Sequence, residues 1–139
     1  MERTIGHLIH FIHVKLKQDL NMRVHCFDVT SEQWDLLNSI YLEEGLSQKT
    51  LAQKTAKDEA SVTRILDKLV AKGFVSKKYH CEDKRSYSLY LTEEGKELRN
   101  KIYPYALGTL DKAMFGLSPE EIRLFKQLLL RISHNLEQK

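Results

Sequence analysis

The segment "DEASVTRILDKLVAKG", residues 58–73, is the most regular stretch of the chain and limits the possible folds most strongly. Its large apolar residues lie three, one, three and one positions apart: Val62, Ile65, Leu66, Leu69 and Val70. This spacing predicts an amphipathic helix with one buried stripe. Asp58 is a favourable N-cap for this helix, and Gly73 is a favourable terminator.

The period of the sequence changes to two directly after this segment. "VSKKYH" and "YSLYL" predict strands over residues 75–80 and 87–91, and the charged residues 82–85 between them are expected at the tip of a hairpin. On the other side, Ser47 caps a short helix over "QKTLAQKT", and a tight turn near Ala56 follows. Two helices joined by a tight turn and followed by a hairpin make a winged helix-turn-helix.

Helices are also expected before this unit. Residues 4–24 carry apolar side chains at helical spacing, which predicts a helix with one buried stripe. Thr30 and Gln33 have the spacing of a capping box, and Gly45 is the expected stop of the helix that this box opens.

Two further helices are expected after the hairpin. Thr92 caps the first, and Pro104 is expected to kink or break it near residues 100–104. Ser118, followed by a proline at the first helical position, opens the last helix. Its apolar surface is wider than one stripe, which predicts packing on two sides.

These elements predict a mainly α fold with a small β-hairpin wing, that is, a winged helix-turn-helix with flanking N- and C-terminal dimerisation helices. Residues 1–139 form a single domain in this interpretation, residues 30–91 its DNA-binding part, and residues 1–24 and 92–139 its dimerisation part. The terminal segments carry more apolar surface than a lone winged helix can bury, which predicts a C2 homodimer.

The charge of the chain is concentrated in its middle. Residues 47–91 carry ten Lys and Arg against five Asp and Glu, whereas the rest carries twelve against fourteen. A basic middle between neutral-to-acidic ends predicts an anionic partner, and DNA is the leading candidate.

The polar face of the segment 58–73 is suited to the DNA major groove, which admits an α-helix. Arg64 lies one turn into this helix and is expected to reach a guanine, whose two acceptors match the guanidinium fork. Arg85 on the hairpin is expected to enter a narrow minor groove, where negative potential is concentrated. Asp83, two residues away, is expected to hold Arg85 or the loop backbone in one geometry.

"SVTRILDKLVAKGFVSKK" followed by "EDKRSYSLYLTEEGKEL" resembles the MarR family of bacterial transcription regulators. The matching features are a "TR-x-LD-x-L-x-x-KG" recognition helix, a "D-x-R" wing and an "LT-x-x-G" start to the next helix. The resemblance implies a homodimer that binds a palindromic operator on double-stranded DNA, usually as a repressor. A cytoplasmic location is expected separately, because the first residues show neither the continuous apolar core nor the small-residue cleavage site of a signal peptide. It also implies release by a small phenolic or amphipathic ligand or by thiol oxidation. One departure is Cys81, where the family usually has proline or another loop residue.

The residues expected to contact DNA are Ser47, Gln48, Ser61, Thr63, Arg64, Lys68, Asp83, Lys84 and Arg85. Four aromatic residues are candidates for lining a ligand pocket between the dimerisation and DNA-binding parts: Phe11, Trp34, Tyr41 and Tyr105. Aromatic residues at helical spacing are also compatible with a plain core role.

Other functions have weaker support in the sequence. Cys26 and Cys81 leave open a thiol-based redox sensor, and a winged helix can also serve as a protein–protein interaction module. His7, His10 and His13 lie three apart but precess around a helix without accompanying Cys or acidic residues, so no metal or cofactor is expected. The chain shows no catalytic motif and no membrane-spanning run, so neither an enzyme nor a membrane partner is expected.

Overall fold

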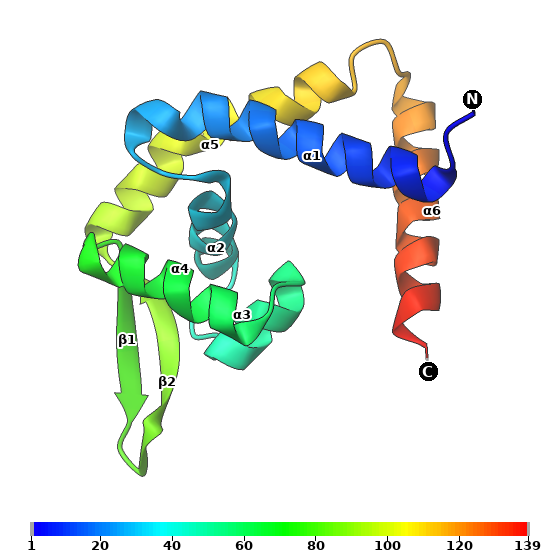
Figure 1. Cartoon of the computed structure of the whole chain (residues 1–139). Coiled ribbons are helices and arrows are strands. Elements are labelled where there is room, and N and C mark those ends of the chain that lie inside the picture. Colours follow the sequence, from blue (N-terminus) through cyan, green and yellow to red (C-terminus); the bar gives the residue numbers. More distant parts are fainter. Residues whose placement is uncertain (1, 139) are drawn as a thin grey trace.

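The structure is a computed structural model that describes residues 2–138, apart from the side chains of Asp83 and Lys84. Its elements follow one another as α1 (Ile5–Val24), a 3-10 helix η1 (His25–Phe27), α2 (Ser31–Leu42), α3 (Gln48–Thr55), α4 (Glu59–Ala71), β1 (Val75–His80), β2 (Asp83–Leu91), α5 (Glu93–Ala113) and α6 (Pro119–Glu137) (Figure 1). This arrangement is the predicted winged helix-turn-helix with flanking helices.

The helices begin at the predicted capping residues. The side chains of Thr30, Ser47, Asp58, Thr92 and Ser118 each accept a hydrogen bond from the backbone N–H three residues further on. Full capping boxes form at the starts of α2 and α6. Each such cap stabilises its helix by about 1 kcal/mol.

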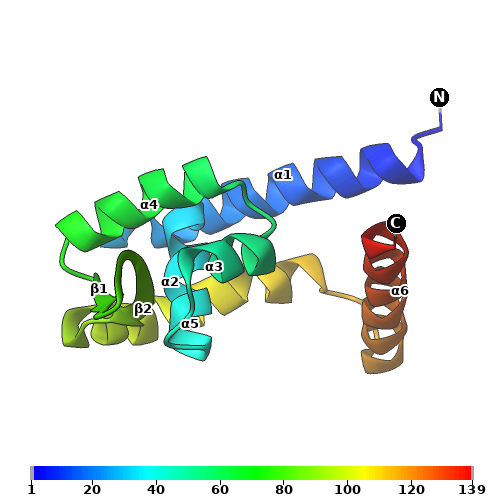
Figure 2. The same ribbon diagram turned by 90° about the horizontal axis from the view of Figure 1, so that it is seen from below.

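The core lies where α2, α3 and α4 pack against the base of the hairpin (Figure 2). The apolar stripe of α4 is buried as predicted, except that Val70 is exposed. Helix α2 ends at Leu42, before the predicted stop. Gly45, with φ +90°, instead turns the chain so that Leu46 forms an isolated bridge with the fully buried Leu89.

The hairpin is longer than the sequence predicted. The antiparallel register runs from Val75↔Leu91 to Tyr79↔Tyr87 and then jumps to His80↔Asp83, which leaves residues 84–86 inserted in β2. The charged residues therefore lie largely in the strand, and the turn holds only residues 81–82. The prediction that the second strand starts at residue 87 was wrong, because the outer hairpin projects beyond the core and its strands need no apolar alternation there.

The base of the hairpin is joined to α5 through close backbone packing. The Thr92 hydroxyl donates to the carbonyl of Gly73 at 2.6 Å, and the Thr92 N–H donates to the carbonyl of Phe74 at 3.1 Å. A Cβ at Gly95 would lie 2.1 Å from the Phe74 oxygen. Only glycine fits at this position of α5 unless the backbone moves.

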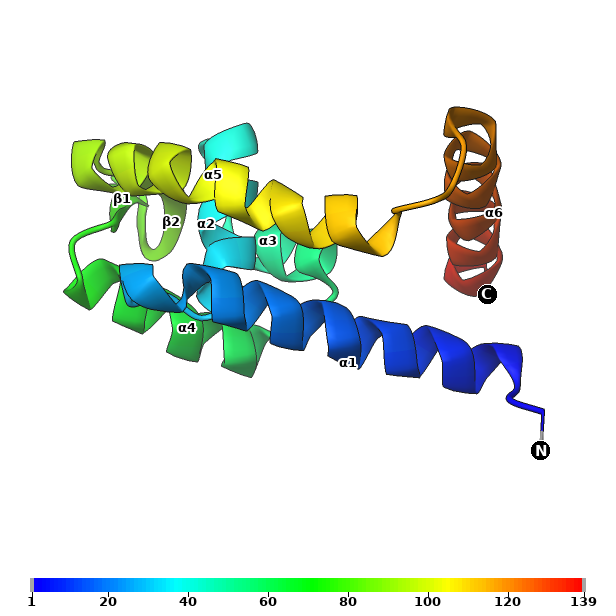
Figure 3. The same cartoon turned by 90° about the horizontal axis from the view of Figure 1, so that it is seen from above.

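Helix α5 continues through Pro104 as one helix, so the alternative of a full break at this proline is wrong. α5 runs beside α1 (Figure 3). The carboxylate of Asp19 on α1 joins the two helices. It accepts hydrogen bonds from Thr109 Oγ1 at 2.8 Å and Lys112 Nζ at 3.2 Å on α5, and from Arg23 Nε at 2.6 Å.

Helix α6 stands away from the rest of the chain (Figures 1–3). Its large apolar side chains from Leu124 to Leu136 are between 41% and 81% exposed. On α1, the first part of the predicted stripe, from Ile5 to Ile12, is exposed as well. One chain leaves both surfaces exposed over the described residues, and their burial against a second copy stays a prediction.

Candidate nucleic-acid interface

The exposed face of α4 presents cationic side chains. Arg64 and Lys68 lie one turn apart, both are exposed, and neither forms an ion pair within 4.0 Å among the described residues. Ser61 lies in the first turn of α4. Hydrogen bonds from its side chain, the larger cause, and from its backbone N–H lower the pKa of the Asp58 carboxyl. An amphipathic helix anchored by its apolar stripe thus holds Arg64 and Lys68 toward solvent.

The predicted contact residues on α3 are engaged within the protein. The Ser47 hydroxyl accepts from the Thr50 N–H at 3.1 Å and donates to Thr50 Oγ1 at 3.0 Å. The Gln48 amide donates to the hydroxyl of Thr63 on α4 and accepts from the hydroxyl of Tyr87 on β2. The structure therefore brings Gln48 and Thr63 together, as parts of a link to the hairpin that the sequence did not reveal.

The hairpin places Arg85 in the inserted stretch of β2, where the residue is exposed. The side chains of Asp83 and Lys84 lie outside the described residues, so the predicted wing pair of Asp83 and Arg85 stays a prediction. Cys81 is exposed in the hairpin turn, and Cys26 is exposed after α1; both are free thiols.

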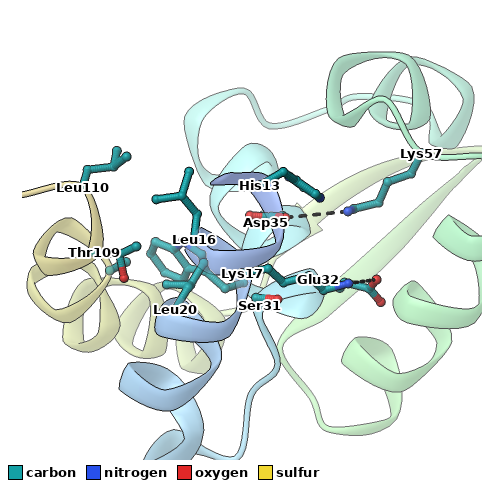
Figure 4. A pocket seen from close by; sticks show the side chains of 12 residues that line it. His13, Leu16, Lys17, Leu20, Ser31, Glu32, Asp35, Lys57, Thr109 and Leu110 are labelled. Carbon is teal, nitrogen blue, oxygen red and sulfur yellow. Dashed lines mark hydrogen bonds and ion pairs between the residues drawn. The ribbon is translucent and has the colours of Figure 1, made fainter. Parts of the chain in front are cut away.

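A cavity of about 420 Å³ lies between α1, α2 and α5 (Figure 4). It is lined by His13, Leu16, Lys17, Leu20, Ser31, Glu32, Trp34, Asp35, Lys57, Ala106, Thr109 and Leu110. Two ion pairs lie in its wall: Lys17 Nζ is 2.9 Å from Glu32 Oε1, and Lys57 Nζ is 3.7 Å from Asp35 Oδ2.

The pKa values of the two acidic residues in this cavity are shifted in opposite directions. The hydrogen bond from Lys17 lowers the pKa of Glu32. Burial raises the pKa of Asp35 despite the attraction of Lys57. Because 48% of the Asp35 side chain is still exposed, this shift carries little stability.

The four aromatic residues proposed for a ligand pocket do not gather at one place. Trp34 lines the cavity described above, and Phe11 lines a second, more apolar cavity of about 720 Å³ between α1, the end of α5 and α6. Tyr41 instead packs against the buried Arg99 guanidinium, 3.9 Å from its ring centroid, and Tyr105 packs edge-on against Phe27.

The charged lining of the first cavity was missed in the sequence, because solvated helix faces carry the same residue types. His7, His10 and His13 are exposed along α1. Within residues 2–138, no three His, Cys, Asp or Glu side chains are arranged to hold a metal ion. Over the same residues, no helix has the length and apolar character that crossing a membrane requires.

Comparison with known proteins places this geometry in a family. A model of the MarR family matches residues 29–87. The uncharacterized HTH-type transcriptional regulator YdgJ of Bacillus subtilis (strain 168) is 31% identical over 111 residues, which cover 80% of this chain and 68% of YdgJ. The chain belongs to the MarR family. Proteins of the MarR family are transcription regulators rather than enzymes.

Two further relatives agree with this assignment. The HTH-type transcriptional repressor YetL of Bacillus subtilis (strain 168) is 37% identical over 84 residues, or 60% of this chain; the match spans only 50% of YetL. The crystal structure of a mutant MarR from E. coli complexed with operator DNA has a TM-score of 0.84 and 26% identity, and the match covers 92% of both chains.

Proposed function

We propose that this MarR-family chain is a DNA-binding transcription regulator that acts as a repressor, binds a palindromic operator as a homodimer and is released by a small ligand. The observation that carries the proposal is the exposed cationic face of α4, with Arg64 and Lys68, beside a hairpin that carries Arg85. The operator DNA bound to the E. coli MarR mutant supports it.

In the proposed complex, α4 enters the major groove and the hairpin follows the adjacent minor groove. Arg64 donates both arms of its guanidinium to one guanine, which discriminates against other bases by about 1–3 kcal/mol. Lys68 contacts phosphate, and Arg85 enters the minor groove where it is narrow. Ser47, the N-cap of α3, and Ser61, in the first turn of α4, would contact phosphate by giving up the hydrogen bonds that their hydroxyls donate to Thr50 and Asp58.

The uncovered apolar faces support the proposed homodimer. The outer part of α1 and all of α6 expose large apolar side chains that one chain leaves in water. A second copy related by a two-fold axis would cover these faces and present two α4 helices to one face of DNA. Half-sites about 34 Å apart would then match one turn of the double helix.

The cavity lined by Trp34 is the proposed site of a small amphipathic or phenolic ligand. Its wall contains Lys57, which lies in the turn between α3 and α4 and pairs with Asp35. An anionic group of the ligand that pairs with Lys57 in place of Asp35 would change the contacts of the residue directly before Asp58, the N-cap of α4. Such a change at the start of α4 would reposition Arg64.

The proposal is tested by selecting bound duplexes from random DNA with the purified chain at physiological ionic strength. We expect a palindrome to be enriched, its affinity to fall steeply with salt because counterions are released, and a dimer mass in light scattering. Phe125→Asp on α6 should reduce the dimer mass and the affinity together. No enrichment over unselected DNA would favour a protein–protein interaction module instead.

The release step is tested on the selected duplex. Phenolic carboxylates are added to the wild type and to Lys57→Met, and hydrogen peroxide is added to the wild type and to Cys81→Ser. Release that needs Lys57 supports the ligand proposal. Release by peroxide that Cys81→Ser abolishes would instead make the protein a thiol-based sensor.

A further inference from the structure

The hairpin is tied to both helices of the helix-turn-helix by one glutamine side chain. Gln48, the first residue of α3, accepts from the Tyr87 hydroxyl on β2 through its amide oxygen. Its amide nitrogen donates to Thr63 Oγ1 on α4. The Thr63 hydroxyl donates onward to the backbone carbonyl of Glu59 at 2.9 Å. These bonds run in one direction from strand to helix, so each group is satisfied by the next.

A second connection supports the ring of Tyr87. Lys77 on β1 lies 4.8 Å from the centroid of that ring, and its Nζ is 3.7 Å from Asp67 Oδ1 on α4. Tyr79 packs edge-on against the same ring, with centroids 5.4 Å apart. Because Thr63 and Asp67 are one helical turn apart, the hairpin is linked to α4 at two levels on one side, directly at Asp67 and through Gln48 at Thr63.

The two connections flank the residues proposed to read DNA. Arg64 follows Thr63 directly, and Arg85 lies two residues from Tyr87 on the same strand. An isolated two-stranded hairpin is marginally stable, so the position of its outer part depends on contacts with the helices. Fixing the hairpin before binding lowers the entropy cost of placing both arginines at once.

We propose that Gln48 and Tyr87 are positioning residues that hold the hairpin at a fixed angle to α4, so that Arg64 and Arg85 engage their two grooves together. The inference rests on the proposed DNA-binding function. It also assigns Gln48 and Thr63 a different role from the DNA contact expected from the sequence, because their polar groups bond within the protein.

The anchoring itself is tested without DNA. Hydrogen exchange of the hairpin amides is compared in the wild type, Tyr87→Phe and Gln48→Met. The matched control is Tyr79→Phe, since the Tyr79 hydroxyl forms no hydrogen bond with the described residues. We expect hairpin exchange to rise about three- to tenfold in Tyr87→Phe, which loses one hydrogen bond, to rise at least as much in Gln48→Met, which loses two, and to stay unchanged in the control. Unchanged exchange in Tyr87→Phe would overturn the proposal, whether or not the chain binds DNA.

The consequence for recognition is tested on the duplex selected by the wild type. Tyr87→Phe should bind about three- to tenfold more weakly per half-site. It should lose minor-groove protection from hydroxyl radicals but keep major-groove protection of guanine N7. In the Arg85→Ala background, Tyr87→Phe should cost little more, because the groove contact is already gone.

Two outcomes contradict the positioning role. Equal loss of protection in both grooves would indicate a general structural defect. If combining Tyr87→Phe with Gln48→Met lowers the DNA affinity by the product of the two single-variant factors, each residue contacts DNA independently. If the wild type selects no duplex, the proposed function fails while the exchange measurement still decides whether Gln48 and Tyr87 anchor the hairpin.

Discussion

Replacing Asp19 by asparagine tests the link between α1 and α5. The side chain is only 14% exposed. The hydrogen bond from Arg23, followed by that from Thr109, lowers the pKa of Asp19 from 3.8 to about 2. At 1.36 kcal/mol for each pKa unit, the ionised carboxylate stabilises the fold by about 2 kcal/mol. Asparagine keeps the shape and one acceptor oxygen but removes the charge.

The pH dependence of this contribution follows from the direction of the shift. Because the pKa of Asp19 is lower in the folded chain, its stabilisation is complete above the unfolded value of 3.8 and is lost as the pH falls toward 2. The free energy of unfolding of Asp19→Asn should therefore be about 2 kcal/mol below that of the wild type at pH 7. The two proteins should converge near pH 2.

Urea unfolding followed by circular dichroism, at one protein concentration because association shifts the midpoint, measures this difference. The matched control is Asp111→Asn, an exposed aspartate on α5. A difference between wild type and Asp19→Asn that stays constant from pH 7 to pH 2.5 would refute the electrostatic reasoning. An equal loss in Asp111→Asn would show that net charge, and not the contacts of Asp19, is responsible.

Three further variants test other parts of the structure. Arg64→Ala should relax base preference at one position per half-site, at a cost of about 1–3 kcal/mol, when its selected sequences are compared with those of the wild type. Arg85→Ala should weaken binding most on duplexes with A/T-rich minor grooves; equal affinity on such duplexes in a titration would rule out the groove contact. Gly95→Ala should lower the free energy of unfolding by about 1–3 kcal/mol in urea, because the added methyl meets the Phe74 carbonyl.

The local elements were predictable because their signals are local. Each α-helix after α1 follows a capping residue whose side chain accepts a hydrogen bond from the backbone N–H three positions further on, as those of Thr30 and Ser118 do. The stripe of α4 was predictable for the same reason, since its spacing alone selects a buried face. Burial of the terminal helices was not, because the sequence pattern of α6 is the same whether its cover is this chain or a second copy.

The connections between distant elements could not be predicted. Gln48 and Tyr87 are 39 residues apart, and neither residue type distinguishes a bridge to another element from a surface position. The start of β2 was missed because Asp83 to Arg85 carry no apolar alternation, although their backbone extends the strand. The charged wall of the cavity, with Lys57 and Asp35, could not be predicted either, because a lysine in a turn and an aspartate on the polar face of a helix are typical of solvated positions.

Because Gly95 of α5 packs closely against the Phe74 backbone, just before β1, a motion of α5 would tilt the hairpin about this contact. The six residues of β1 extend about 20 Å from that contact, at roughly 3.3 Å for each residue. A tilt of about 5° at the contact would therefore displace the far end by nearly 2 Å, a distance that breaks a hydrogen bond. Small motions of the flanking helices are therefore amplified at the tip of the hairpin. The hydrogen bonds of the Gln48 side chain to Tyr87 and Thr63 oppose these motions.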